Sequence, residues 1–566
     1  MAPPTLCRSV PCDLSRFSLS VGGQFLAFRP MKMRSLLVLL VALAVALVTA
    51  RAVAHQRQHQ HERQRRLQPL HAAPSLRLRV AVKRASMAIH GHRTFDVSVA
   101  RATGAPPLRQ FEFNGVVSFP TADAVTHTYS LVDGVAFHEL QHANGSDATT
   151  VSLVALHRLP PIHEALAAIA DAVPVTAASV GGRAVQCPPG MELLHATFAS
   201  DDFALCAATG PVAVGLLFRF IGSDLDIDVF AETARVAIDA PATARQRPSH
   251  WGRVPRSATR PTRPPSVSLG RSLALRNASC ACPSQRKRPC LFFHGMDIKA
   301  DRGVVDDFDF FGDIKLHTPC CSSVKFAVYN TVDFAWNNAT LQDRACADAL
   351  AQSPSSDRQT RTIKDTILVA HSMGNLMLAH AIASKRCALH SSSSWVDLSG
   401  PMRGSMGSDL QQYVCNGGNV AKDALAVLVG LFGQCPSSRA RQALVYQGGK
   451  YATDDLNRQY DEAQAAHAAH VSASVCGDSY NGLLSKDWLG LYLGGTILPH
   501  KSKENDGVVE FQSCAGRLPS SAFGRTWRSP FYRAKLNHAD TQFKNGDALF
   551  DDAQKPLKWF ECLAVL

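Results

Sequence analysis

The sequence has no apolar run of the roughly 20 residues that a membrane-spanning helix needs. Its longest such run, Leu36–Val48, is well short of that length. Acidic residues are also absent between Pro241 and Pro289, where eleven arginines and lysines lie. The net charge of +13 therefore comes from this segment and from the basic N-terminal residues, and the rest of the chain is acidic overall. Basic charge confined to tails and a linker is only weak support for nucleic-acid binding, so we expect no nucleic-acid partner.

The first 54 residues carry the pattern of a secretory signal peptide. Basic residues precede the apolar run Leu36–Val48, and the small-x-small sequence Ala52–Ala54 follows it. We therefore expect residues 1–54 to be removed during secretion. In the alternative, the segment 36–54 stays uncleaved and anchors the protein to a membrane.

The segments on either side of this signal core carry no motif with a defined chemistry. Residues 1–30 make an unusually long start to a signal, and a translation start at Met31 or Met33 would make them a spurious extension. Residues 55–84 are rich in glutamine, histidine and arginine. We interpret them as a basic tail or propeptide.

Cysteine usage agrees with an oxidising compartment. The chain has 16 cysteines, and signal cleavage would remove Cys7 and Cys12 and leave an even number. Cys187 and Cys206 lie alone in the first half and could pair with each other. The connectivity of the other twelve cannot be read from the sequence. Three glycosylation sequons fit the same compartment: Asn144-Gly-Ser, Asn277-Ala-Ser and Asn338-Ala-Thr.

Residues 85–240 are predicted to form a β-rich or α+β module of unknown role. Apolar and polar residues alternate in four short runs, as in half-buried strands. These runs are Thr94–Ala100, Phe111–Asn114, Thr126–Val132 and Val212–Phe218. Residues 162–171 have helical spacing instead. Residues 241–288, rich in proline, arginine and serine, are predicted to be a linker.

Between residues 289 and 566, segments typical of strands alternate with segments typical of helices. Apolar runs of strand length lie at 289–293, 324–329, 367–370, 395–398 and 471–475, and helical spacing occurs at 341–351 and 375–385. This alternation indicates an α/β domain with a mostly parallel central sheet and helices on both faces.

The segment around Ser372 has the form of a nucleophile elbow. The apolar run that ends at Ala370 is followed by His-Ser-Met-Gly and then by helical spacing. In such an elbow a buried strand stops in a tight turn, the serine projects from its tip and a helix begins directly behind it. Only small residues fit two positions before and after the serine, and here these are Ala370 and Gly374.

A serine nucleophile needs a base, and the base needs a carboxylate that fixes its tautomer. Asp506 and His538 follow Ser372 in the chain order of an α/β-hydrolase. Asp397, at the end of the strand after the elbow, is the alternative acid, and Asp506 could instead be an ordinary turn aspartate. His500 is a weaker candidate base because it precedes Asp506. His294 is interpreted as a structural loop residue.

Attack on a carbonyl also needs donors for the oxyanion. The backbone N–H of Met373, directly after the serine, is one expected donor. The second should come from the loop after the first strand of the domain, where the sequence reads Phe293-His-Gly-Met-Asp297. This places the N–H of Met296 as the second donor.

Residues 288 to 566 resemble secreted lipases of the α/β-hydrolase superfamily, particularly the bacterial triacylglycerol lipases. The matching motifs are His294-Gly295, Ala370-His-Ser372-Met-Gly374, Asn505-Asp506-Gly507 and Asn537-His538-x-Asp540. The resemblance implies Ser372 as nucleophile, Asp506 as acid and His538 as base, with no organic cofactor.

The same resemblance raises a possible structural calcium ion at Asp540. In some of those lipases the aspartate two residues after the catalytic histidine ligates calcium. A calcium site needs a second carboxylate. Asp478 and Asp487 are the candidates, although neither lies in a convincing motif.

An apolar segment at residues 421–433 is a candidate lid. It lies between Cys415 and Cys435, which could form a bridge, and falls where lipases insert caps. We hypothesise an apolar helix that covers Ser372 and moves at a lipid surface. The alternative is a buried core helix.

The sequence thus predicts a secreted serine hydrolase that cleaves carboxylic esters, with lipids as the expected substrates, through an acyl-enzyme on Ser372. One alternative is an acyltransferase that uses the same three residues. Another is an inactive binding or adhesion protein with a relic hydrolase domain.

Overall fold

The computed structural model describes residues 60–102, 113–142, 149–154, 162–199, 201–210, 215–241, 272–275, 280–283, 286–483, 485 and 487–566. The expected signal peptide or anchor and the sequons at Asn144 and Asn277 lie outside these ranges. In the ranges that are described, no helix is long and apolar enough to cross a membrane.

The first half of the chain forms an eleven-stranded sheet in the order β6-β5-β4-β3-β2-β1-β13-β12-β11-β10-β7, and all its neighbouring strands are antiparallel. Its strands are β1 (Ser75–Val82), β2 (Thr94–Arg101), β3 (Phe113–Pro120), β4 (Val125–Val132), β5 (Val135–His142), β6 (Thr150–Val154), β7 (Val173–Pro174), β10 (Met191–Phe198), β11 (Asp201–Ala208), β12 (Gly215–Gly222) and β13 (Leu225–Glu232). Helix α2 (Ile162–Asp171) contacts β10. The expected β-rich region is therefore present.

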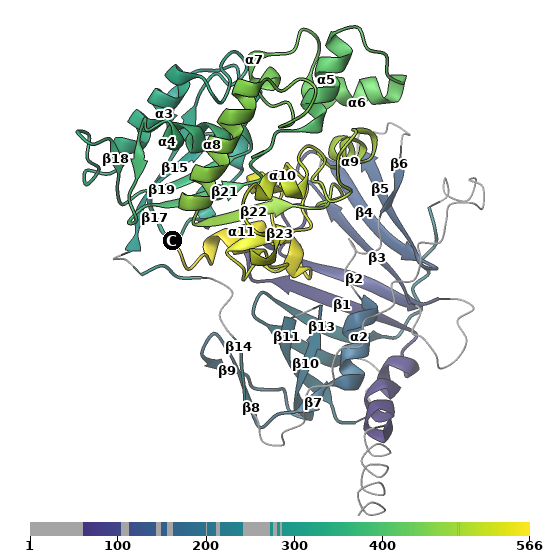
Figure 1. The fold of residues 1–566 in the computed structure, drawn as a ribbon. Helices are drawn as coiled ribbons and strands as arrows, with labels where there is room; N and C mark the ends of the chain where they lie inside the picture. Colours follow the sequence, from purple (N-terminus) through teal and green to yellow (C-terminus); the bar gives the residue numbers. More distant parts are fainter. Residues whose placement is uncertain are drawn as a thin grey trace, which may run out of the picture. The chain divides into compact units, whose positions relative to one another are not determined.

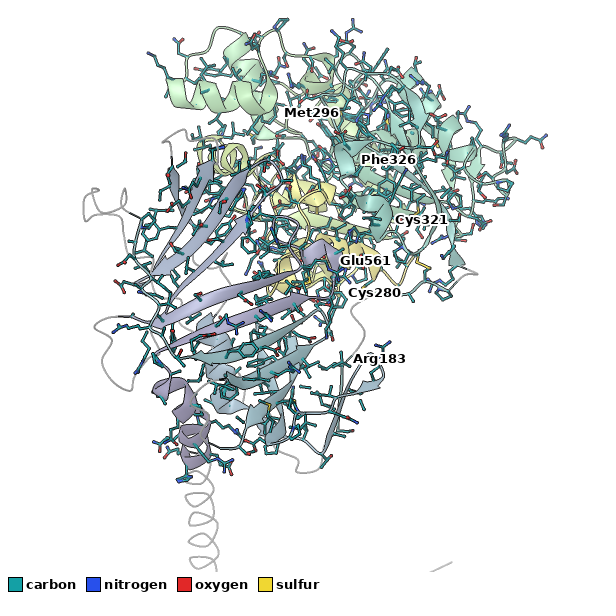
Figure 2. All side chains as sticks on the ribbon, turned by 180° about the vertical axis from the view of Figure 1, so that it is seen from behind. Arg183, Cys280, Met296, Cys321, Phe326 and Glu561 are labelled. Carbon is teal, nitrogen blue, oxygen red and sulfur yellow. A yellow bond between two sulfur atoms is a disulfide. The ribbon has the colours of Figure 1, made fainter. Side chains whose placement is uncertain are left out.

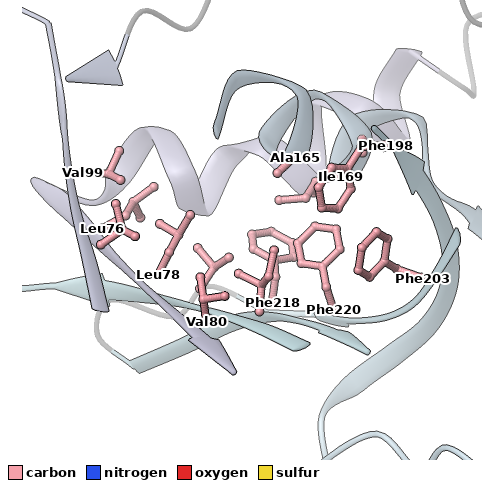
Figure 3. Close-up of a cluster of buried hydrophobic side chains, with 14 of the residues drawn as sticks. Leu76, Leu78, Val80, Val99, Ala165, Ile169, Phe198, Phe203, Phe218 and Phe220 are labelled. Atoms are coloured by element: carbon pink, nitrogen blue, oxygen red, sulfur yellow. The ribbon is translucent and has the colours of Figure 1, made fainter. Parts of the chain in front are cut away.

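Strand β1 lies within the segment 55–84 expected to be a basic tail or propeptide, so this part of the segment belongs to the fold. Leu76, Leu78 and Val80 point into the apolar cluster that also contains side chains of α2 and β12 (Figure 3). Arg77 and Arg79 occupy the alternate positions on the other face, where they pair with acidic residues of β2 and β13. Buried apolar residues and outward arginines therefore alternate regularly along β1, as in a half-buried strand.

A small second sheet reaches into the segment expected to be a linker. Its order is β14-β8-β9, with β14 (Ser272–Leu275), β8 (Ala177–Val180) and β9 (Arg183–Ala184). Strand β14 pairs in parallel with β8, so four residues of the 241–288 segment belong to this sheet.

The C-terminal half contains a seven-stranded sheet in the order β16-β17-β15-β19-β21-β22-β23. Its strands are β15 (Arg288–Phe293), β16 (Gly303–Val305), β17 (Cys321–Val328), β19 (Ile367–His371), β21 (Ser394–Leu398), β22 (Ala473–Gly477) and β23 (Phe531–Ala534). Every neighbouring pair is parallel except β16–β17. The predicted mostly parallel sheet is confirmed. The short strands β18 (Thr362–Ile363) and β20 (Ala388–Leu389) form a separate parallel pair.

Apolar layers cover both faces of this sheet, because successive strand residues point to opposite sides. Leu291 and Phe293 pack into one layer, and Cys290 and Phe292 pack into the other. Helices α3 (Ala339–Leu350), α4 (Met373–Ala383) and α8 (Asp454–His470) cover the first face (Figure 1). The second face is covered by the 3-10 turns η5 (Asp309–Phe311) and η6 (Ile314–His317) and by α11 (Pro556–Glu561).

Seven disulfides link the fourteen cysteines of the described residues. One is the expected Cys187–Cys206 bridge of the first half. The other six lie between residues 280 and 562, and they are Cys280–Cys562, Cys282–Cys320, Cys290–Cys321, Cys346–Cys387, Cys415–Cys435 and Cys476–Cys514. Figure 2 shows Cys280 close to Glu561, the residue before its disulfide partner.

Candidate active site

Ser372 occupies the turn between β19 and α4 in a strained backbone conformation, with φ 53° and ψ −128°. The turn leaves no room for a side chain at Gly374. A Cβ added to Gly374 would lie 2.7 Å from the carbonyl oxygen of His294. Only glycine fits such a close backbone approach. This conformation lifts the serine out of the strand and into contact with groups from later in the chain.

The structure brings Ser372, His538 and Asp506 into one hydrogen-bonded row. Ser372 Oγ lies 3.0 Å from His538 Nε2, and His538 Nδ1 lies 2.8 Å from Asp506 Oδ2. All three residues are buried. The distances are those of direct hydrogen bonds, so a proton can pass from the serine to the imidazole without an intervening water.

Asp506 uses its two carboxylate oxygens for different tasks. Oδ1 accepts the backbone N–H groups of Val508 and Val509 at 3.0 and 2.7 Å. Oδ2 is thereby aimed at His538, whose own backbone N–H donates to the carbonyl oxygen of Asp506 at 2.9 Å. Asp506 is therefore both an aspartate that caps its own turn and the partner of His538.

The alternative candidates from the sequence belong to other contacts. Asp397 is fully buried at the end of β21, where Oδ2 meets His467 Nε2 at 3.0 Å and Ser474 Oγ at 2.9 Å. His500 Nδ1 lies 3.2 Å from Glu510. Neither residue contacts His538 or Ser372 through a hydrogen bond.

The loop after β15 packs directly against the serine. A Cβ added to Gly295 would lie 2.9 Å from Ser372 Cβ, so this loop approaches Ser372 as closely as glycine permits. His294 Nδ1 and Thr331 Oγ1 both donate to the carbonyl oxygen of Gly295, at 2.7 and 2.9 Å. These bonds fix the loop that carries Met296, the expected second oxyanion donor.

His294 is a structural residue of this loop. Burial lowers its pKa to about 4, so the imidazole is neutral at physiological pH. A neutral ring donates from Nδ1 to Gly295 and accepts the backbone N–H of Tyr329 at Nε2, at 3.0 Å. Both ring nitrogens are used, which leaves no nitrogen to act as a second base.

Two residues that support the elbow and the loop were not singled out from the sequence. Asn375 donates to the carbonyl oxygen of Ala370 at 2.7 Å and accepts from the indole of Trp395 at 3.1 Å, which braces the elbow from behind. Thr331 follows β17 and holds Gly295. Asn375 is the first residue of the predicted helix 375–385, but nothing near Thr331 in the sequence indicates its contact.

The surroundings of Asp540 do not fit a calcium site. Its Oδ2 accepts the backbone N–H groups of Leu483 and Asn537 at 2.7 and 3.0 Å, and Oδ1 accepts the amide of Asn545 at 2.9 Å. Calcium needs several oxygen ligands, which these N–H donors do not provide. The proposed second carboxylates, Asp478 and Asp487, pair with cationic side chains instead. Across the described residues, no group of three metal-ligating side chains includes Asp540.

An apolar cluster borders the three loops of the site. It includes Val508 and Val509 beside Asp506, and Ala539 beside His538, with Met296 packed against it. Leu428 and Phe432 of α6 (Lys422–Phe432) and Leu491 of α9 (Trp488–Ile497) belong to the same cluster.

Helix α6 is the segment predicted to be a lid. It packs on α5 (Met406–Cys415) and α9, and the Cys415–Cys435 bridge spans its two ends. Its Leu425 is 40% exposed, whereas Leu428 and Phe432 are buried. The helix therefore lies over apolar residues next to the site and keeps an apolar side chain in solvent.

The short helices α7 (Arg439–Gln442) and α10 (Phe511–Ala515) also lie in the C-terminal half. Arg441 of α7 reaches Asp297 in the loop after β15, with Nη2 2.5 Å from Oδ1. This ion pair ties the outer end of the loop that carries Met296.

Comparison with known proteins adds little to this geometry. No protein-family model and no curated protein matches the chain. Among solved structures, a metagenomic carboxyl esterase is 14% identical over 53% of this chain and 80% of its own, with a TM-score of 0.27. The haloalkane dehalogenase DbeA from Bradyrhizobium elkani is 14% identical over 39% of this chain and 81% of its own, with a TM-score of 0.20. Similarity at this level carries no argument about this chain.

Proposed function

We propose that this protein is an α/β-hydrolase that cleaves carboxylic esters through an acyl-enzyme on Ser372. The observation that carries the proposal is the continuous hydrogen-bonded row from Ser372 through His538 to Asp506. The parallel sheet, the serine in a strained turn after a central strand and the chain order of the three residues support the same conclusion.

The arrangement accounts for each proton of the reaction. Ser372 Oγ attacks the ester carbonyl while its proton moves to His538 Nε2, and Asp506 stabilises the imidazolium through Nδ1. The N–H groups of Met373 and Met296 stabilise the oxyanion. The alcohol leaves with the proton from His538. A water then attacks the acyl-enzyme, gives its proton to the same nitrogen and releases the acid, and Ser372 recovers its proton.

The apolar cluster beside the site favours esters with an apolar acyl group. Such a group can lie along residues that border the loops of Asp506 and His538, which removes apolar surface from water. In this proposal α6 moves away to admit the substrate at a lipid surface. Activity should then rise sharply once the ester exceeds its solubility, whereas smooth saturation through that point would contradict the lid. The seven disulfides favour action in an oxidising, extracellular compartment.

Labelling with a fluorophosphonate probe tests the nucleophile directly. We expect the intact protein to be labelled and Ser372→Ala to lose both the label and the ester hydrolysis. Ser384→Ala, at the other end of α4, is the matched control and should keep both. Equal labelling of the two variants would exclude Ser372 as the nucleophile, and an unlabelled wild-type protein would favour an inactive binding protein. Product analysis with added alcohols distinguishes hydrolysis from acyl transfer.

A further inference from the structure

The C-terminal half places two apolar side chains inside the core of the N-terminal sheet. Leu549 and Phe550 belong to the apolar cluster formed by β1, α2, β10, β11 and β12. The ring of Phe550 lies 5.6 Å from that of Phe198 on β10. Neither residue contributes to the cores of the parallel sheet. The loop before α11 therefore completes the core of the other module.

Buried lysines of the C-terminal half face carboxylates of the N-terminal sheet. Lys555 is fully buried, with its Nζ 3.2 Å from Asp201, 3.6 Å from Asp224 and 3.2 Å from Asp552. Lys558 also pairs with Asp224. Asp201 and Asp224 lie in β11 and in the turn between β12 and β13. If the modules separated without unfolding, these charges would lose their partners, which is costly for buried ion pairs.

A second polar contact joins the 3-10 turn η1 (Ala85–Met87) to the same C-terminal segment. Ser86 Oγ donates to Asp547 Oδ2 at 2.7 Å, and the backbone N–H of Asp547 donates to the carbonyl oxygen of Ser86 at 2.7 Å. Arg84 Nη2 lies 2.7 Å from Glu561 Oε2. A Cβ added to Gly546 would lie 2.5 Å from the carbonyl oxygen of Ser86, so the two backbones are in close contact.

The contact continues to the loop that holds His538. Asn545, two residues before Asp547, donates to Asp540 Oδ1 at 2.9 Å. Asp540 Oδ2 in turn accepts the backbone N–H of Asn537, the residue before His538. The segment from Asn537 to Asp547 is thus tied to the site at one end and to the N-terminal sheet at the other.

None of the seven disulfides among the described residues joins the two modules. Strand β14, on the C-terminal side of the basic segment 242–271, pairs with β8 of the first half. We propose that the N-terminal module, which is the eleven-stranded sheet with α2, stays docked on the C-terminal half and braces the loop that carries His538. Once the basic segment is cut, non-covalent contacts alone hold the two parts together. The claim that the module braces the His538 loop rests on the proposed function, whereas the claim that the two modules stay docked does not.

Cutting the chain tests the docking. A site for a specific protease is inserted within residues 242–271 of the full chain, and the nicked protein is run on gel filtration without denaturant. We expect both fragments to elute together at the position of the uncut protein. Fragments that separate under these conditions overturn the proposal.

Single substitutions in the nicked protein locate the contact. We expect Arg84→Met to raise the dissociation constant of the two fragments by about tenfold or more, since it removes the buried Arg84 guanidinium that pairs with the largely buried side chain of Glu561. Arg79→Met is the control, because Arg79 is half exposed and pairs with Asp96 inside the same module. Equal dissociation constants for the two variants contradict the docking contact. Where Arg84→Met does not fold, Ser86→Ala replaces it.

The rate of fluorophosphonate labelling in the uncut chain tests the bracing. Ser86→Ala should slow labelling at Ser372 several-fold, whereas Ser118→Ala, an exposed serine on β3, should leave the rate unchanged. Equal rates overturn the brace even where the fragments stay together. A wild-type protein that is not labelled refutes the proposed function, and co-elution of the fragments still decides the docking.

Discussion

His371 Nε2 lies 3.2 Å from the backbone carbonyl oxygen of His538. His371, which directly precedes Ser372, therefore supports the loop of the histidine that faces Ser372. The two imidazole rings are 4.8 Å apart, and His371 is buried. Burial and the neighbouring His538 lower the pKa of His371 well below its usual value. A neutral His371 can donate its Nε2 hydrogen to the carbonyl, which makes it a positioning residue for the base.

Replacing His371 should therefore lower turnover more than substrate binding. We expect His371→Leu to reduce kcat by about tenfold with little change in KM, because the loop of His538 loses one hydrogen bond. His371→Gln keeps a donor and should recover part of the loss. Steady-state kinetics on a soluble ester measure both variants. A purely structural role would instead lower the yield of folded enzyme and leave the kcat of each folded variant equal to that of the wild type.

The two candidate acids should respond differently to the same substitution. Asp506→Asn removes the charge that fixes the tautomer of His538, and we expect kcat to fall by about 10³- to 10⁴-fold. Asp397→Asn should leave kcat within about tenfold of the wild type, since Asp397 pairs with His467. It should instead lower the free energy of unfolding by up to about 3 kcal/mol, because the buried His467 and Ser474 lose the carboxylate that accepts their hydrogen bonds. Kinetics and denaturant unfolding together measure both effects, and a loss of kcat confined to Asp397→Asn would reassign the acid.

Gly295 should tolerate no side chain. Its added Cβ would lie 2.9 Å from Ser372 Cβ, so Gly295→Ala must displace either the nucleophile or the loop of Met296. We expect kcat/KM to fall by about 100-fold, comparable to the loss of one oxyanion donor. The control is Gly430→Ala on α6, where an added Cβ meets nothing within 4 Å. That change should preserve activity and stabilise the helix by up to about 1 kcal/mol. Similar activity in the two variants would show that the loop is more adaptable than its packing indicates.

The strand, elbow and helix around Ser372 could be predicted because their signals are contiguous. The apolar run of β19, the small residues Ala370 and Gly374 and the spacing of α4 occupy about twenty neighbouring positions. Asp506 and His538 were expected from their order in the chain, and the structure places His538 within hydrogen-bonding distance of both Ser372 and Asp506. Helix α2 was predicted at the residues where it occurs, because its apolar spacing is regular.

Contacts between distant segments could not be predicted. Asp397 and His467 are 70 positions apart, and the residues around each of them carry no pattern that indicates the contact. The same holds for Ser86 and Asp547. Strand β1 was hidden for another reason: its outward residues are arginines, so a basic composition masked the alternation. The pattern of Asn537-His-x-Asp540 suggested a metal ligand, whereas the structure uses the carboxylate to accept backbone N–H groups.

The stability of the protein should fall as pH decreases from about 6.5 to 4, in part because of His294. Its folded pKa of about 4 lies below the ordinary value of 6.5, so in this window the unfolded chain binds a proton that the folded chain does not. Stability then rises with pH, and the contribution is complete above pH 6.5. The shift corresponds to about 3 kcal/mol.

His294→Gln isolates this contribution, because the amide can still accept from Tyr329 and donate to Gly295 but does not titrate. Urea unfolding at intervals from pH 7 to pH 4 gives the free energy of unfolding for both proteins. We expect the wild type to lose about 3 kcal/mol more than the variant over this range, so that the two curves converge at low pH. Parallel curves would mean that His294 is protonated in the folded protein, and its two hydrogen bonds could not then both hold, since a protonated ring has no acceptor nitrogen for the N–H of Tyr329.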